Sequence, residues 1–102
     1  MKVILLRKDR IEYVLTKCVL FYKAPRIALL GYVRKRKPSI RKKLIMKILR
    51  EVADLSFKEV GYLCSCNVSR AYKAINEVNY EIEIDADVRR NYEALVKEIL
   101  EN

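Results

Sequence analysis

The spacing of apolar residues along the chain is that of amphipathic helices. From Ile11 to Tyr22 the apolar positions fall at offsets of 0, 3, 4, 7, 8 and 11, which place them in one stripe on a helix that Pro25 then ends. The same spacing predicts further helices in residues 26–31, 40–52, 56–64 and 67–78, and a last helix that is capped by Asp85 or Asp87. We therefore expect an all-α fold of five to six helices in which residues 1–102 form one domain.

One segment, "VNYEIEID" at residues 78–85, fits two interpretations. Its apolar and polar residues alternate with a period of two, which is typical of an edge strand or the arm of a hairpin. The rest of the sequence offers no obvious partner strand, and an isolated hairpin is marginally stable in water. We therefore expect this segment to form the tail of a helix followed by a linker.

The composition is that of a folded, mostly helical protein. Apolar residues make up 52% of the chain, which contains two glycines and two prolines. The three cysteines, Cys18, Cys64 and Cys66, show no disulfide spacing, which fits a reducing compartment, so we expect a cytoplasmic protein. The apolar opening "MKVILL" is too short to span a bilayer and is followed by charged residues, so we expect no transmembrane segment.

Charge is distributed unevenly between the two halves of the chain. The net charge is +9, but residues 1–50 carry sixteen basic and two acidic side chains, whereas residues 51–102 carry six basic and eleven acidic ones. Between Arg34 and Arg50 lie nine basic residues and no acidic one. This density is typical of a surface that binds phosphates, and the alternative is a solvated basic face. The helical period of 40–52 predicts that its basic side chains point away from the core: Arg41, Lys42, Lys43, Lys47 and Arg50.

Residues 55–78 carry the features of two helices joined by a tight turn. Ser56 and Glu59 form a capping-box pattern at the start of the first helix, and Asn67 is a typical N-cap for the second. Gly61 costs roughly 1 kcal/mol relative to alanine inside the first helix, so we expect it to lie where the two segments pack closely. The pattern therefore predicts a helix-turn-helix. Its shared interior is expected to contain Val60, Cys64, Cys66, Ala71 and Ala74.

The outer side of the second helix carries side chains that can contact base edges in a major groove. The expected base-facing set is Asn67, Val68, Ser69, Arg70, Tyr72, Lys73 and Asn76. Asn76 suits adenine, Ser69 suits any base and Val68 suits a thymine methyl group, while Arg70 can reach guanine or a phosphate. For Tyr72 we retain packing against Lys73 or against the first helix as the alternative. The predicted function is sequence-specific binding of double-stranded DNA.

Several segments occur in an order that is known from one DNA-binding family. They are the opening helix "IEYVLTKCVLFYKAP", the short helix "ALLG", a basic loop, "RKKLIMKILREV", "LSFKEVG" and "SRAYKAINEV". From about Arg10 to its end, the chain thus resembles the C-terminal, origin-binding domain of the bacterial replication initiator DnaA, in the helix-turn-helix group that includes Trp repressor. The resemblance implies a nucleoid-associated protein that controls replication or transcription. It also implies contacts with the DNA backbone or minor groove from Arg34, Lys35, Arg36, Lys37, Arg41, Lys42, Lys43, Ser56 and Lys58.

The sequence departs from that family at the start of the second helix. Residues Asn67 to Arg70 stand where the family has Asp-His-Thr-Thr, and Ser69 is the residue that keeps the hydroxyl chemistry. The preceding turn is one residue shorter and lacks the family's paired glycines. We therefore expect the shape to be kept and the DNA target to differ from the initiator's usual box.

We expect neither catalysis nor a bound metal or other cofactor. The chain has no histidine and three cysteines, which are fewer than the four ligands of a structural zinc site, and no Gly-rich phosphate loop precedes a Lys-Ser/Thr pair. Two alternatives to DNA binding remain. The acidic second half can form a homodimer seam or bind replication or transcription machinery as an adaptor or decoy, and residues 1–22 can attach to a membrane surface.

Overall fold

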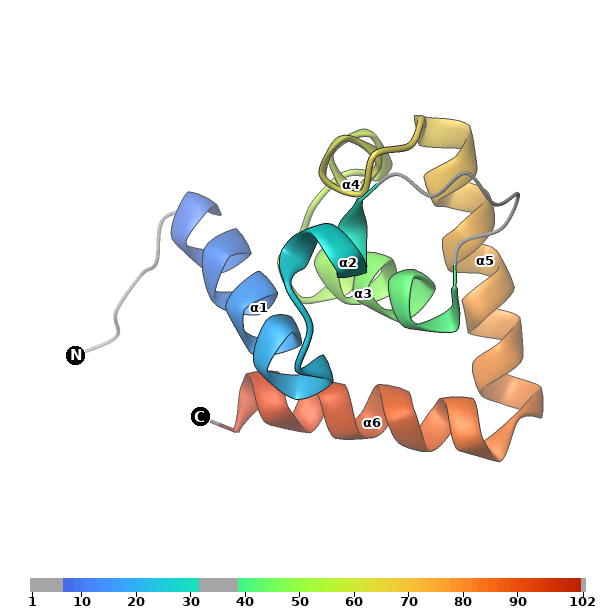
Figure 1. Ribbon diagram of the computed structural model, residues 1–102. Coiled ribbons are helices and arrows are strands. Elements are labelled where there is room, and N and C mark those ends of the chain that lie inside the picture. Colours follow the sequence, from blue (N-terminus) through green and yellow to red (C-terminus); the bar gives the residue numbers. More distant parts are fainter. Residues whose placement is uncertain (1–6, 32–38, 102) are drawn as a thin grey trace.

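The chain forms six α-helices within the residues that this computed structural model describes, which are 7–31 and 39–101 (Figure 1). The helices are α1 (Arg7–Tyr22), α2 (Arg26–Leu30), α3 (Ile40–Glu51), α4 (Phe57–Leu63), α5 (Val68–Ile84) and α6 (Ala86–Leu100). The predicted all-α fold class is confirmed. None of these helices has both the length and the apolar content that are required to cross a bilayer.

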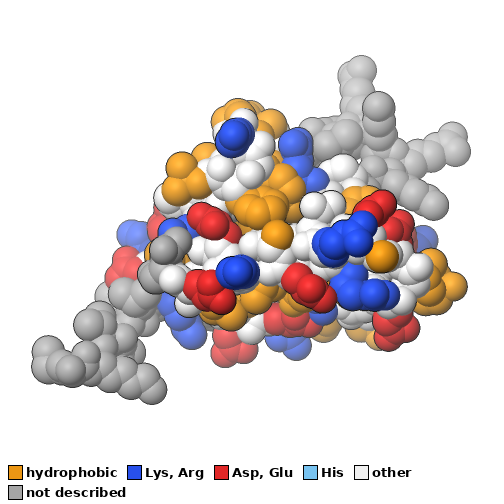
Figure 2. Space-filling model, turned by 90° about the horizontal axis from the view of Figure 1, so that it is seen from below, with side chains coloured by type: hydrophobic (Ala, Val, Ile, Leu, Met, Phe, Trp, Pro, Cys, Tyr) orange, Lys and Arg blue, Asp and Glu red, His pale blue; other side chains and the backbone are white. Residues whose placement is uncertain are grey.

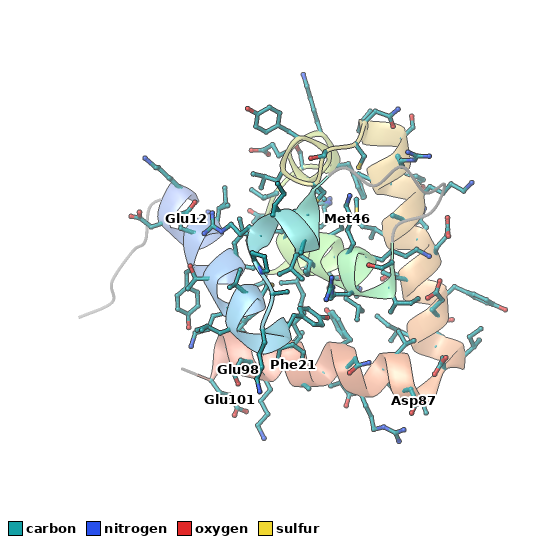
Figure 3. All side chains as sticks on the ribbon, viewed as in Figure 1. Glu12, Phe21, Met46, Asp87, Glu98 and Glu101 are labelled. Carbon is teal, nitrogen blue, oxygen red and sulfur yellow. The ribbon has the colours of Figure 1, made fainter. Side chains whose placement is uncertain are left out.

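Helix α3 lies at the centre of the domain. In Figure 1, α1, α6 and α5 surround it on three sides, and α4 lies at the end of the molecule opposite α6. Helix α3 contacts each of the five other helices. Its apolar residues from Leu44 to Leu49 are at most 1% exposed (Met46 is labelled in Figure 3). Because α3 is enclosed, its polar side chains must also find partners inside the domain.

Side-chain caps begin four of the helices. The capping residues are Ser39, Ser56, Asn67 and Asp85; the caps at Ser56 and Asn67 were predicted from the sequence, and of the two candidates for the last helix it is Asp85 that caps it. At the start of α4 the full capping box is present: the Ser56 hydroxyl accepts from the Glu59 backbone N–H at 3.1 Å, and the Glu59 carboxylate accepts from the Ser56 N–H at 3.0 Å. These bonds satisfy N–H groups that a helix start leaves without intrahelical partners.

The segment that fitted two interpretations is helical. Helix α5 runs to Ile84, and Asp85 both ends α5 and caps α6, so the prediction of a linker is wrong and that of a helix tail is confirmed. Arg89 of α6 donates to the backbone carbonyls of Ile82 and Glu83 at 3.0 and 2.8 Å. Carbonyls at the end of α5 thereby gain partners, which allows two long helices to meet at a single residue.

Contacts of α1 connect the two ends of the described chain. The Tyr13 hydroxyl donates to the Ile99 carbonyl of α6 at 3.0 Å. On the outer side of α1, the Glu12 carboxylate accepts two bonds from the Arg26 guanidinium of α2, at 2.5 and 3.1 Å (Glu12 is labelled in Figure 3). The hydrogen bonds from Arg26 and its charge hold the pKa of Glu12 below its usual value. These contacts fix α1 and α2 against the side of the domain away from α5.

Candidate nucleic-acid interface

Helices α4 and α5 follow one another through a turn of residues 64–67 and form one end of the molecule, which we call the α4–α5 end (residues 56–76; Figure 1). Gly61 lies in the middle of α4, against this turn. A Cβ atom at Gly61 would lie 2.7 Å from the carbonyl oxygen of Cys66 and 3.1 Å from that of Asn67. The close approach expected at Gly61 is therefore present. Its partner is the backbone of the turn, which the side chain of any other residue would displace.

The turn itself is a Schellman motif. The backbone N–H of Cys66 donates to the Gly61 carbonyl at 2.9 Å, which is the 6→1 bond of that motif. Ser65 adopts the left-handed conformation that the motif requires, with φ of 60°. Glycine usually occupies this position, so the turn holds a serine in a conformation that costs roughly 1–2 kcal/mol. The turn fixes how α5 leaves α4.

Helix α5 has one buried and one exposed face over its first three turns. Ala71, Ala74 and Ile75 are at most 4% exposed and pack into the core. Every residue predicted to face bases is exposed: Asn67, Val68, Ser69, Arg70, Tyr72, Lys73 and Asn76. The carboxamide oxygen of Asn67 is used as the cap of α5, where it accepts from the Arg70 backbone N–H at 2.8 Å. The remaining side chains of the set are polar, among them two cations, except for the apolar Val68 and the aromatic Tyr72.

Tyr72 packs against a stack of side chains that was not predicted from the sequence. Its ring contacts the Phe57 ring edge-on, with centroids 5.1 Å apart, so the alternative of packing against the first helix is confirmed. The Arg50 guanidinium lies 4.7 Å from the Phe57 centroid and donates to the Leu55 carbonyl at 3.2 Å. Tyr72 stays 54% exposed. The only sequence signal for this stack was an aromatic residue directly after the Ser56 cap.

The cations predicted to contact the DNA backbone do not share one environment. Lys58 is exposed at the start of α4, beside the exposed Ser56 whose hydroxyl serves the capping box. Arg41 is half-buried, and its guanidinium lies 5.8 Å from the Tyr22 ring and within 3.5 Å of the Ala28 carbonyl. The basic loop residues Arg34, Lys35, Arg36 and Lys37 lie outside the described residues.

The prediction that the lysines of α3 point away from the core is wrong. Lys42 and Lys43 are 7% and 5% exposed, so they do not form part of a phosphate-binding surface. The Lys42 ammonium donates to the Gly31 carbonyl at 3.1 Å, and that of Lys43 donates to Glu77 and Glu81 of α5, both at 3.1 Å. Burial lowers the pKa of Lys43, but the bonds to the two carboxylates outweigh it and leave that pKa raised.

Lys47 occupies a second buried cluster one turn further along α3. Its ammonium donates to the Glu51 carboxylate at 2.5 Å and to the side-chain Oδ1 of Asn79 at 2.6 Å, and it lies 5.1 Å from the centre of the Tyr92 ring. The Tyr92 hydroxyl donates to the same Glu51 carboxylate at 2.7 Å. Burial and the neighbouring carboxylate raise the pKa of Tyr92. Two cations of α3, Lys43 and Lys47, are thus paired with carboxylates of α5 and of α3 itself.

The three cysteines do not form a reactive or metal-binding centre. Cys18 and Cys64 are fully buried, and burial raises the pKa of each thiol to about 12. Cys66 is half-buried in the turn, and burial raises its pKa as well. In the part of the chain that the structure describes, no group of three or more His, Cys, Asp or Glu side chains could hold a metal ion. Their surroundings make the cysteines packing residues.

The acidic second half does not present one acidic surface. Glu51, Glu77 and Glu81 are bonded to lysines of α3. Figure 2 shows the face over α6, where acidic and basic side chains alternate with apolar ones. On this face Asp87 pairs with Arg90. The charged side chains are therefore of both signs on this face, whereas residues 68–76 of α5 carry only cations, Arg70 and Lys73.

No protein-family model, no curated protein and no solved structure matches this chain.

Proposed function

We propose that this chain binds double-stranded DNA through the α4–α5 end, with the outer face of α5 in a major groove. The observation that carries the proposal is the division of α5 into a core face of small and apolar residues and an outer face that includes Ser69, Lys73 and Asn76. A major groove about 12 Å wide admits one α-helix, and hydroxyl, ammonium and carboxamide groups read its edges.

The distribution of charge along α5 supports the same orientation. Its first nine residues, 68–76, contain Arg70 and Lys73 and no acidic residue. The acidic residues begin at Glu77, and the ones at 77 and 81 are bonded to Lys43 within the domain. The exposed face of residues 68–76 therefore carries two cations and no carboxylate, which favours contact with a polyanion.

The position of α4 supports contacts with the DNA backbone. Lys58 is exposed at the first turn of this helix, next to the start of α5. We retain Arg34, Lys35, Arg36 and Lys37 as further phosphate contacts on the strength of their sequence. A role in replication or transcription control, as the likeness to the DnaA C-terminal domain implies, forms part of the proposal.

The test begins with selection of bound duplexes from a random pool at two salt concentrations. We expect an enriched motif and, for contact with about five phosphates, a slope of log affinity against log salt of about −4 to −5. A binding constant that hardly responds to salt, or no binding in dilute buffer, contradicts the proposal. In the first case the adaptor function becomes the better explanation.

Alanine variants then separate groove contacts from backbone contacts. Lys73→Ala and Asn76→Ala should change the preference among bases by about 1–3 kcal/mol, whereas Lys58→Ala should weaken binding to selected and random duplexes alike. Lys97→Ala is the matched control, because Lys97 is an exposed lysine on α6 at the opposite end of the molecule. Equal effects of Lys73→Ala and Lys97→Ala would show that only net charge matters.

A further inference from the structure

A shallow notch lies between α4 and α5 within the α4–α5 end. It is lined by Phe57, Val68, Ser69 and Tyr72 and has a volume of about 300 Å³. Val68 and Tyr72 are 50% and 54% exposed, so the notch presents apolar surface beside the polar outer face of α5. Burying such surface against an apolar group of a ligand is favourable.

The walls of the notch are fixed before any ligand arrives. Phe57 contacts the Tyr72 ring edge-on, and the Arg50 guanidinium, which donates to the Leu55 carbonyl, lies 4.7 Å from the Phe57 ring centroid. The opposite wall, Val68, is the first residue of α5, directly after the Asn67 cap. A preformed site loses little side-chain entropy when a ligand enters it.

We infer, on the basis of the proposed function, that this notch receives the 5-methyl group of one thymine in the major groove. The thymine methyl is the apolar group that the major-groove edges of the four standard bases display, and it stands beside the O4 acceptor of the same base. Ser69 lines the same notch and carries a hydroxyl that can donate to O4. An apolar recess next to a donor matches the methyl and O4 pair.

The charges around the notch favour thymine over a methylated cytosine. Lys58 follows Phe57 on α4, and Lys73 lies one turn after Ser69 on α5; both are exposed. Ammonium groups donate hydrogen bonds, so they suit the O4 acceptor of thymine and oppose the amino group that cytosine places at the same position. The lining contains no carboxylate, but the hydroxyls of Ser69 and Tyr72 can also accept from an amino group, so the comparison with 5-methylcytosine described below decides between the two bases.

The experiment replaces each thymine of the selected duplex in turn by uracil, which lacks only the methyl group. At one thymine in each bound site, we expect affinity to fall about three- to five-fold, which is the loss for one unburied methyl group. Val68→Ala should reduce the ratio of thymine to uracil affinity at that position to about one. Tyr62→Ala is the matched control, because Tyr62 is 85% exposed on α4 outside the notch, and it should leave the ratio unchanged.

The outcomes distinguish this inference from the proposed function. Specific binding that is insensitive to uracil at every position, or a selected motif without thymine, overturns the notch while DNA binding stands. The sensitive thymine is also replaced by cytosine and by 5-methylcytosine. If the added methyl group raises affinity as much on cytosine as it does from uracil to thymine, the assignment to thymine is wrong. A Val68→Ala variant that retains the full ratio overturns the role of this residue. Absence of any DNA binding rejects the proposed function, and the notch assignment with it.

Discussion

Helix α3 and the α4–α5 end both carry lysines, but their surroundings are opposite. Lys43 and Lys47 of α3 lie inside the domain with their ammonium groups bonded to carboxylates. Lys58 and Lys73 of the α4–α5 end are exposed. The difference shows that the lysines are buried and paired where carboxylates lie within reach and stay exposed on the outer faces of α4 and α5. In this chain α5 supplies both environments, because its acidic part faces α3 and its cationic part faces outward.

The largest expected effect comes from removing one buried cation. Lys43→Met keeps the length of the side chain but leaves Glu77 and Glu81 without their shared partner, and their side chains are 34% and 25% exposed. Loss of one partner of a buried ion pair typically costs 3–5 kcal/mol, so with this partial exposure we expect about 3 kcal/mol in the free energy of unfolding, measured by urea titration. The folded fraction should bind DNA as before.

Lys73→Met is the matched control for this comparison. The substitution is the same, but the side chain is exposed, so stability should change by less than about 0.5 kcal/mol while DNA affinity falls. If Lys43→Met and Lys73→Met lower stability equally, the distinction between the two regions is wrong.

The second expected effect concerns the backbone contact that holds the α4–α5 end. Gly61→Ala gains roughly 1 kcal/mol of helix propensity but places a Cβ atom 2.7 Å from the Cys66 carbonyl oxygen. Because that atom belongs to the backbone of the turn, the turn must move, and we expect a net loss of about 1–2 kcal/mol. Tyr62→Ala, at the next position of α4 and 85% exposed, should change stability little. Thermal unfolding of both variants measures the difference, and a more stable Gly61→Ala protein would refute the tight contact.

The helices and their caps could be predicted because both are local. Apolar residues three and four apart and a cap such as Ser56 depend on neighbours in the sequence, and the structure has them where they were expected. The surface of α5 could be predicted for the same reason, since its buried residues Ala71, Ala74 and Ile75 define the opposite face.

The burial of the α3 lysines could not be predicted from the helical spacing of apolar and polar residues. A helical period counts Lys43 as polar and places it outward, but its partners Glu77 and Glu81 are 34 and 38 residues away along the chain. The long apolar stem of lysine lets its ammonium reach such partners while the rest of the side chain is buried. The available signal was the complementary charge of the two halves of the chain, which equally fits an external polyanion.

A smaller expected effect tests the Lys47 cluster by pH. Burial raises the pKa of Glu51, but the hydrogen bonds from Lys47 and Tyr92 outweigh it and hold that pKa below its usual value of 4.5. The stability that the carboxylate contributes is therefore present above about pH 4.5 and is lost as pH falls through the lower folded value. Because the Glu51 side chain is 45% exposed, we expect no more than about 1 kcal/mol.

Glu51→Gln isolates this contribution. It removes the titrating group, so the fall in unfolding free energy between pH 5 and pH 3 should be smaller than in the parent protein. Glu93→Gln, at an exposed position of α6, should keep the slope of the parent. Identical slopes for Glu51→Gln and the parent would show that the cluster adds no stability.

The smallest expected effect lies in the turn, and its sign is opposite to the others. Ser65 has a positive φ of 60°, which costs a side-chain-bearing residue roughly 1–2 kcal/mol and glycine almost nothing. Ser65→Gly relieves this strain but increases the backbone entropy of the unfolded chain, so a net stabilisation of about 0.5 kcal/mol remains. Ser65→Ala removes the hydroxyl without relieving φ and should not stabilise the protein. The turn sets the direction in which α5 leaves α4. A Ser65→Gly protein that is more stable and binds DNA unchanged would therefore show that the strain at Ser65 can be removed without changing that direction. Equal melting temperatures for the glycine and alanine variants would mean that the left-handed serine carries no such strain.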